Sequence, residues 1–310
     1  MIYRACALGA ETELSVEREG LRIGSRFLDY AEFQALTPLN HRVVLELCSG
    51  EHVEITMLGF SYDGFWEELS GSFAARSLEA LFVEGAPLMS CEGEYQIPGD
   101  AGRGQIELYA DAVCILPPNS HAVRLPLCFT ERIDLDGYLI RLTLFDGTVF
   151  SFGRMGYDTK PFAERACQSM ERSKKERAAL LAGVPQKPLF PRAGLFRTTQ
   201  KELSWNAAFG AGCCAVELET GDAAATYLYR YEEAQPVFTF RLELAMEAMG
   251  PHREIIYMTD EQLAQKPLYR MSVARCPAVS YLRAHSAGRL IHTQNHGEKL
   301  SAFLAGTSPE

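Results

Sequence analysis

The stretch Val43-Val44-Leu45-Glu46-Leu47-Cys48-Ser49-Gly50-Glu51-His52-Val53-Glu54-Ile55 occurs a second time, ninety-seven residues further on, as Ile140-Arg141-Leu142-Thr143-Leu144-Phe145-Asp146-Gly147-Thr148-Val149-Phe150-Ser151-Phe152. The two stretches align without a gap, and the alignment continues until Phe65 lies over Phe162. Internal similarity of this kind indicates one folding unit used at least twice. The shared positions carry apolar side chains and turn glycines, which is typical of a scaffold.

Each copy is predicted to consist of about seven short strands closed by one helix. Alternating apolar residues predict strands over residues 1–57, and apolar residues at every third or fourth position predict an amphipathic helix from Tyr62 to Leu81. The second copy repeats this plan, with a hairpin turn at Asp146-Gly147 and a helix over residues 158–181. The glycine-rich run Gly99-Asp100-Ala101-Gly102-Arg103-Gly104 is expected to be a connector.

A third, divergent copy is expected after the proline-rich linker Val184-Pro185-Gln186-Lys187-Pro188-Leu189-Phe190-Pro191, because proline interrupts helices and strand ladders. A hairpin over residues 213–231 and a helix opening at Pro236 follow the order of the earlier copies. Thr259-x-x-Gln262 then predicts a helix with a capping box. The sequence therefore predicts a mainly β, α+β protein with domains at residues 1–90, 91–185 and 186–310.

The composition bounds the class of protein. The chain has 310 residues, and its 47% hydrophobic and 23% charged residues are ordinary for a globular protein. It lacks an apolar run long enough to cross a membrane, so no integral membrane association is expected. Its nine cysteines are an odd, scattered set, which favours reduced thiols and a cytoplasmic location.

The net charge of −10 is concentrated at the start of the chain. Residues 1–90 hold 6 Arg and no Lys against 14 acidic residues, a balance of −8. Such a charge repels phosphate backbones and anionic membranes, so no nucleic acid is expected as a partner.

Seven strands closed by a C-terminal helix resemble the pleckstrin-homology-like superfold. The resemblance rests on the order of elements over residues 1–181, with a hairpin and helix recurring near 213–250, and extends to uncharacterised bacterial proteins built from such repeats. It implies tandem barrels, each closed by its helix, and no particular activity. Lipid-binding members of the superfold carry Lys and Arg in the first hairpin. Here Gly9-Ala10-Glu11-Thr12-Glu13 is acidic and no lysine precedes Lys160, which argues against phosphoinositide binding by the first domain.

The histidines near the end of the chain are the first candidate site. His292-x-x-x-His296, with His285 upstream, could ligate zinc if it lay on one helix face. The composition of residues 293–297 is that of a turn, and no glutamate follows the first histidine as it does in metalloprotease helices. These histidines are therefore expected in a surface loop, and no metal is expected.

Two further groups have a chemical and a structural interpretation. Cys213-Cys214 is unlike a Cys-x-x-Cys redox site, and strand geometry would place at most one of the two thiols in the core. Asp134 and Asp136 could form a carboxylate pair, but they flank the turn at Gly137 and are expected to be solvated hairpin acids.

A run of tyrosines leaves two interpretations open. Tyr227, Tyr229 and Tyr231 alternate along one face of a predicted strand. They could form an exposed aromatic recognition surface. More often such a face belongs to the core, because aromatic side chains pack well on a half-buried sheet.

The leading hypothesis is a non-enzymatic interaction or scaffold protein whose partner is an unknown protein or peptide. The open strand edges of such barrels can accept an added strand. The alternative is an enzyme or small-ligand-binding protein with its site in residues 190–310, around Tyr229, Arg230, His292 and His296. A lesser alternative is a membrane-surface adaptor that uses Lys174 and Lys175. No cofactor is expected.

Overall fold

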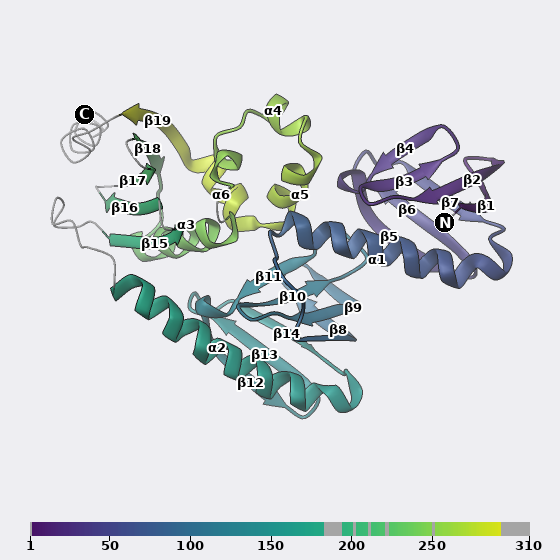
Figure 1. Cartoon of the computed structure of the whole chain (residues 1–310), viewed down its shortest axis with the longest axis horizontal. Helices are drawn as coiled ribbons and strands as arrows, with labels where there is room; N and C mark the ends of the chain where they lie inside the picture. Colours follow the sequence, from purple (N-terminus) through teal and green to yellow (C-terminus); the bar gives the residue numbers. More distant parts are fainter. Residues whose placement is uncertain are drawn as a thin grey trace. The chain divides into compact units, whose positions relative to one another are not determined.

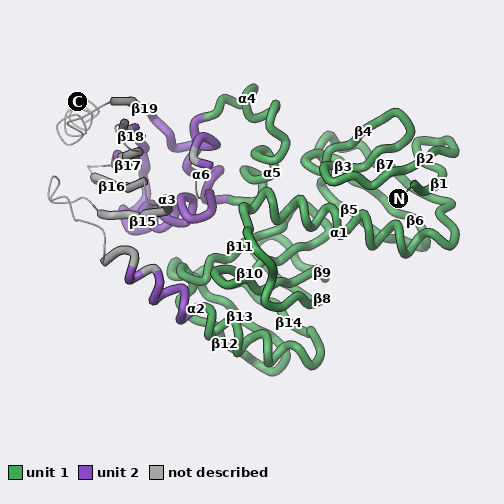
Figure 2. The backbone as a smooth tube through the Cα atoms, in the orientation of Figure 1, with its two compact units in different colours: residues 1–169, 258–276 green, residues 170–257, 277–310 purple. Residues whose placement is uncertain are grey.

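The structure is a computed structural model that describes residues 2–182, 194–200, 203–209, 212–220, 223–249 and 252–292. The chain divides into two compact units (Figure 2). Unit 1 contains residues 1–169 and 258–276, and unit 2 contains residues 170–257 and 277–310. A segment of the third predicted domain thus belongs to unit 1, while the three domain limits stay predictions.

Unit 1 contains two seven-stranded antiparallel sheets, each followed in sequence by a long helix (Figure 1). The first sheet has the order β4-β3-β2-β1-β7-β6-β5 and the second has the order β11-β10-β9-β8-β14-β13-β12. The first copy comprises β1 (Ile2–Ala7), β2 (Ala10–Val16), β3 (Gly20–Ile23), β4 (Arg26–Asp29), β5 (Phe33–Leu39), β6 (Arg42–Leu47), β7 (His52–Thr56) and α1 (Tyr62–Ala80). The second comprises β8 (Met89–Ile97), β9 (Asp100–Leu108), β10 (Ala112–Leu116), β11 (Val123–Pro126), β12 (Thr130–Asp136), β13 (Leu139–Leu144), β14 (Val149–Gly153) and α2 (Thr159–Ala182). The predicted α+β, mainly β class is confirmed.

The strand pairing of the two copies has the same register at an offset of ninety-seven residues. Leu45 pairs with Val53 in the first hairpin, and its counterpart Leu142 pairs with Phe150 in the second. The bulge between Phe33 and Ala35 recurs in the second copy between Thr130 and Arg132. The register predicted from the repeated stretch is therefore present in the strand pairing.

The corner between the last strand and the helix also follows one backbone path in both copies. Met57 and Arg154 have φ values of 61° and 54°, and Gly59 and Gly156 have values of 56° and 62°. A Cβ built on either glycine would meet nothing within 4 Å. The glycines are therefore needed for their left-handed conformation and not for close packing.

The core of the first copy lies between its sheet and the inner face of α1. Phe65, Leu69 and Phe73 lie on that face and are at most 1% exposed, and the ring of Phe65 meets Tyr3 edge-on at 5.1 Å. Ser61 occupies the N-cap position, but its side chain makes no capping hydrogen bond. Burial of the apolar face, more than capping, therefore holds this helix.

The glycine-rich run at residues 99–104 was predicted to be a connector. This prediction is wrong, because residues 100–104 belong to β9. Gly102 pairs with Tyr95 on β8, and a Cβ at this position would approach the Tyr95 hydroxyl to 3.2 Å. At Gly104 a Cβ would approach the carbonyl oxygen of Leu116 to 2.9 Å. The glycines permit close approach of neighbouring groups within a strand, and this crowding has no trace in local sequence.

Unit 2 contains a five-stranded sheet, in the order β15-β16-β17-β18-β19, and several helices. The predicted hairpin and the helix at Pro236 are present as β17, β18 and α3. In each earlier copy the strand that precedes the helix pairs with the first strand of that copy. In unit 2 the corresponding strand, β18, pairs instead with β19, which follows the helices in sequence. The strands and α-helices beyond residue 193 are β15 (Gly194–Gln200), β16 (Leu203–Phe209), β17 (Cys213–Thr220), β18 (Ala223–Arg230), α3 (Gln235–Met249), α4 (Asp260–Ala264), α5 (Pro267–Arg275), α6 (Pro277–His285) and β19 (Ser286–His292).

Two local predictions in this region have opposite outcomes. The capping box is confirmed, because the Gln262 amide donates to Thr259 Oγ1 and the Thr259 amide donates to the Gln262 side chain. The prediction for the cysteines is wrong, since Cys213 and Cys214 are 7% and 0% exposed. Residues 213–216 are all buried, so both faces of β17 are covered there. The predicted linker at 184–191 lies outside the described residues.

Candidate functional site

The outer edge of β5 holds an added extended segment from the second copy. The Leu36 amide donates a 2.7 Å hydrogen bond to the Pro118 carbonyl, and the Ser120 amide donates a 2.8 Å hydrogen bond to the Gln34 carbonyl. Between these bonds, Ala35 pairs with Asn119 as an isolated antiparallel bridge. Main-chain bonds of this kind depend on an exposed edge and an extended segment, and not on the side chains. We call this segment, residues 118–120, the clip.

The clip lies in an insertion that only the second copy has. In the first copy Ile23 pairs with Arg26, so two residues join β3 to β4. In the second copy Ile115 pairs with Val123, so the corresponding loop has seven residues. The five extra residues supply the clip, and with it the second copy closes the edge of the first.

Asp100 holds the clip in place from β9. Its Oδ2 accepts hydrogen bonds from the Tyr95 hydroxyl at 2.7 Å and from the side-chain Nδ2 of Asn119 at 2.9 Å. The same oxygen lies 3.2 Å from His121 Nδ1. Burial alone would raise the pKa of Asp100. The hydrogen bonds from Tyr95 and Asn119, together with the neighbouring His121, outweigh burial and hold the pKa of Asp100 below its ordinary value of 3.8. The carboxylate is thus the anchor that fixes the loop.

We expect Asp100→Ala to release the clip. Hydrogen bonds to a charged group each contribute about 1.5–3 kcal/mol, so the exchange rate of the Leu36 amide should rise at least about ten-fold. Hydrogen–deuterium exchange followed by NMR measures this rate. Glu92→Ala, which removes an exposed acid from the neighbouring β8, is the control. Equal exchange rates in both variants would contradict the anchoring role.

Acid should have the same effect as the substitution. Because the folded state lowers the pKa of Asp100, its carboxylate contributes stability above the unfolded pKa, near 3.9, and loses it as the pH falls through the folded pKa. The clip should therefore hold at neutral pH and release only below about pH 4. Leu36 exchange, corrected for the intrinsic effect of pH, would show this.

β12 is the counterpart of β5 and the last strand of the second sheet. Leu36 is 2% exposed beneath the clip, whereas its counterpart Ile133 is partly exposed. Leu135 is 41% exposed. The charged side chains of this strand pair locally, with Arg132 3.3 Å from Asp134 and Arg141 on β13 3.2 Å from Asp136. The exposure expected for Asp134 and Asp136 is confirmed.

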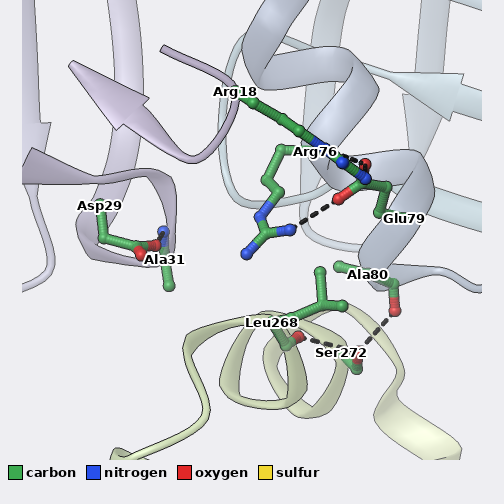
Figure 3. A network of polar contacts seen from close by, with 8 residues as sticks. All are labelled: Arg18, Asp29, Ala31, Arg76, Glu79, Ala80, Leu268 and Ser272. Carbon is green, nitrogen blue, oxygen red and sulfur yellow. Dashed lines mark hydrogen bonds and ion pairs between the residues drawn. The ribbon is translucent and has the colours of Figure 1, made fainter.

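A second added element covers α1. Helix α5 packs against α1 within unit 1. Met271 is 1% exposed and joins the core of the first copy. Ser272 donates a 2.6 Å hydrogen bond to the Ala80 carbonyl at the end of α1 (Figure 3). The Arg275 guanidinium lies 5.5 Å from the centre of the Phe73 ring, and burial lowers the pKa of Arg275 to about 10.

An ion-pair cluster lies at the same end of α1. The Glu79 carboxylate accepts hydrogen bonds from Arg18 at 2.7 Å and from Arg76 at 2.6 Å (Figure 3). Burial would raise the pKa of Glu79, but these two arginines hold it below its usual range. Arg18, Arg76 and Glu79 all belong to the first copy. The cluster therefore fixes α1 against the loop that follows β2. It has the character of a structural tie and not of a reaction site.

The predicted tyrosine face belongs to the core of unit 2. Tyr227, Tyr229 and Tyr231 are 8%, 0% and 7% exposed. The Tyr229 hydroxyl contacts that of Tyr257, whose ring stacks on Tyr227 at 3.9 Å, and Tyr231 stacks on Phe238 at 4.4 Å. Burial raises the pKa of Tyr229. Of the two interpretations, the packing one is confirmed.

The other predicted site residues do not gather around Tyr229. Arg230 ends β18 and is exposed. His292 pairs with Ala224, while Tyr229 pairs with Ser286. Five residues of strand separate these positions, a distance of about 17 Å. His296 lies outside the described residues.

One titratable group in unit 2 was not singled out from the sequence. Burial raises the pKa of Glu243, on α3, to about 7. Nearby along the helix, Arg241 lies 3.6 Å from Glu233 and its guanidinium is 4.5 Å from the Tyr281 ring. A glutamate in an amphipathic helix gives no sequence signal of burial, because its depth depends on which helices pack against it.

The described residues show no helix long and apolar enough to cross a membrane. Within the same ranges, no three His, Cys, Asp or Glu side chains gather as metal ligands would. The site with the clearest geometry is therefore the open sheet edge, which β5 forms in the first copy and β12 forms in the second. Comparison of the sequence with known proteins found no match, either to a family model or to a curated protein.

Proposed function

We propose that this protein is a non-enzymatic scaffold, built from tandem pleckstrin-homology-like domains, that binds extended protein segments at the open edges of its sheets. The observation that carries the proposal is the clip on β5, with its 2.7 and 2.8 Å main-chain hydrogen bonds. It is an instance of strand addition within one chain. The resemblance to the superfold is supported by two antiparallel seven-stranded sheets, each followed by a helix.

An edge strand favours such binding for a physical reason. Its outward amides and carbonyls lack a neighbouring strand, and an incoming extended segment satisfies them. Affinity then comes from the main chain, and specificity comes from the side chains that flank the edge. β5 is already used in this way. β12 is the equivalent edge for a partner, where the Ile133 carbonyl accepts only a long contact of 4.0 Å from Cys167 Sγ on α2, which an added main-chain segment would replace.

The two edges differ in the residue that would block pairing. Pro38 on β5 has no amide hydrogen and pairs with Val43 on β6. Its counterpart on β12 is Leu135, which pairs with Ile140 on β13. Proline at an outward position is a common device against unwanted edge pairing. β12 lacks this device, as a strand-accepting edge should.

Leu135→Pro therefore tests the proposal with little disturbance of the fold. The change removes one outward amide, and Pro38 is a precedent for proline at this position. Full-length wild-type and variant chains are immobilised and exposed to lysate of the native cell. Proteins that bind through β12 should be retained by the wild type and lost with Leu135→Pro. Circular dichroism verifies that the variant is folded.

Leu39→Ala is the matched control, because it removes a leucine of similar exposure, 43% against 41%, from the edge that the clip occupies. The control should retain every protein that the wild type binds. Equal retention by wild type and Leu135→Pro, or no retained protein at all, would refute binding at this edge.

A further inference from the structure

We propose that α5 is a releasable strap, which opens from α1 while the sheets of unit 1 stay folded, and that the buried charge of Arg275 sets how often it opens. The inference goes beyond the proposed function, because it concerns a helix and not a strand edge. Three observations support it: the contacts that dock α5, the burial of a guanidinium edge in the same contact, and the breaks in the backbone at both ends of the helix.

The first observation defines the docked surface. Met271 packs into the core of the first copy, and Ser272 donates a 2.6 Å hydrogen bond to the Ala80 carbonyl (Figure 3). One turn further along α5, the guanidinium of Arg275 lies 5.5 Å from the centre of the Phe73 ring, two turns earlier on α1. The contacts therefore advance along the two helices in opposite directions, so α5 runs antiparallel to α1 and covers one face of its last turns.

The second observation is that this contact buries a charge without satisfying it. Arg275 is 5% exposed, and its Nε and Nη2 atoms are buried and make no hydrogen bond to any described residue. These two nitrogens form the edge of a guanidinium that binds a carboxylate side-on. Arg22 uses the same edge on Glu17, at 2.6 and 3.3 Å. Ser77 Oγ, one turn beyond Phe73 on α1, is likewise buried without a hydrogen bond in the described part of the chain.

A buried charge of this kind opposes docking. The guanidinium stays charged at neutral pH, because burial lowers the pKa of Arg275 only to about 10. Docking removes it from water, and its contact with the Phe73 ring offsets only part of that loss. A buried charge with unpaired donors is less favourable than an apolar side chain of similar size in the same place. Release of α5 restores the hydration of Arg275, so this residue favours the open state.

The third observation is that both ends of α5 are fixed breaks in the helical backbone. Lys266 and Cys276, the residues that flank α5, have non-helical φ and ψ values of −124° and 82°, and of −122° and 92°. Each precedes a proline, Pro267 or Pro277, which disfavours helical conformation at the residue before it. The nine residues of α5 can therefore leave α1 as one helix without unwinding α4 or α6.

Release exposes the part of the first copy that lies under the strap. Phe73 is 1% exposed when α5 is docked, and the centre of its ring lies 5.7 Å from that of Tyr30 and 6.1 Å from that of Phe33. Helix α5 also contacts the turn that holds Tyr30. The strap thus alternates the first copy between a closed surface and one that presents a group of aromatic rings, and such local opening requires less free energy than global unfolding.

Hydrogen–deuterium exchange of the full chain, followed by NMR, tests the strap without any substitution. We expect the amides in the middle of α5, residues 271–274, to exchange at least about ten-fold faster than the amides of β6 in the first sheet, because they require only local opening. Equal rates would mean that α5 leaves α1 only when unit 1 unfolds, and would overturn the proposal.

Substitution of Arg275 decides whether its charge drives the opening. Arg275→Met removes the charge and keeps an unbranched side chain of similar helix propensity, so exchange of the same amides should slow at least about ten-fold. Arg275→Lys keeps a buried charge and should give no such protection. Arg270→Met is the matched control, because it makes the same change at a partly exposed position of α5, and it should alter the rates by less than about two-fold.

The sign of the Arg275→Met effect distinguishes a strained strap from a stable anchor. If the guanidinium anchored α5 through its contact with Phe73, loss of that contact would speed the exchange. Faster or unchanged exchange in Arg275→Met would therefore refute the proposal, as would equal protection in Arg275→Met and Arg275→Lys. The result is independent of strand addition, because none of the substituted residues lies on β5 or β12.

Discussion

Replacing Phe65 or Phe162 with alanine should destabilise its own copy by about 3–5 kcal/mol, the usual cost of truncating a buried aromatic side chain. Both rings are 0% exposed. Phe65 packs edge-on against Tyr3 at 5.1 Å, and Phe162 packs edge-on against Phe152 at 5.8 Å. Each phenylalanine anchors the helix of its copy to the sheet, so its loss leaves a cavity between them. Denaturant unfolding measures the change.

The chain offers matched controls for these substitutions. Phe60 and Tyr157 occupy equivalent positions at the corner before each helix and are 112% and 101% exposed. Phe60→Ala and Tyr157→Ala should therefore leave the free energy of unfolding within about 0.5 kcal/mol of the wild type. If the buried and exposed substitutions had equal effects, the helices would have to pack by other faces.

Met271→Ala should destabilise unit 1 by about 2–5 kcal/mol, although the residue lies 191 positions beyond the end of α1 in sequence. The reason is its burial at 1% in the core that α1 and the first sheet form. Trp66 packs against the same core, and with Trp205 replaced by Phe it becomes the only tryptophan. Its fluorescence then reports unfolding of unit 1.

Gln265→Ala is the control for Met271→Ala, because it changes an exposed residue that directly follows the preceding helix α4. It should leave the unfolding curve seen by Trp66 in place. A Met271→Ala curve that coincides with the control would show that α5 does not contribute to the core of unit 1.

Sequence patterns predicted the elements that depend on neighbouring residues. The hairpins at Val43–Ile55 and Ile140–Phe152 follow from alternation and a turn glycine, and the Thr259 capping box follows from two side chains three residues apart. The prediction that at most one of the adjacent Cys213 and Cys214 would be buried was wrong, because burial on both faces of β17 depends on what covers the sheet.

The candidate edge could be predicted only in outline. Open strand edges follow from the predicted topology, but the clip joins Ala35 to Asn119 without any periodic signal. The sign of the clip in the sequence is the longer loop after Ile115, and this difference in loop length can be recognised only when the strand pairing is known. Met271 gave no sign either, because an apolar helix residue looks the same whichever sheet it packs against.

Unit 1 begins to form early in translation and is completed late. Helix α1 ends at Ala80, but the segment that covers it runs to Cys276. At about 5–20 residues per second, a ribosome needs roughly 10–40 s to make the intervening chain. Throughout that interval the face of α1 that Met271 later covers is open to the cell. The nascent chain therefore presents to chaperones an apolar surface that the finished molecule hides.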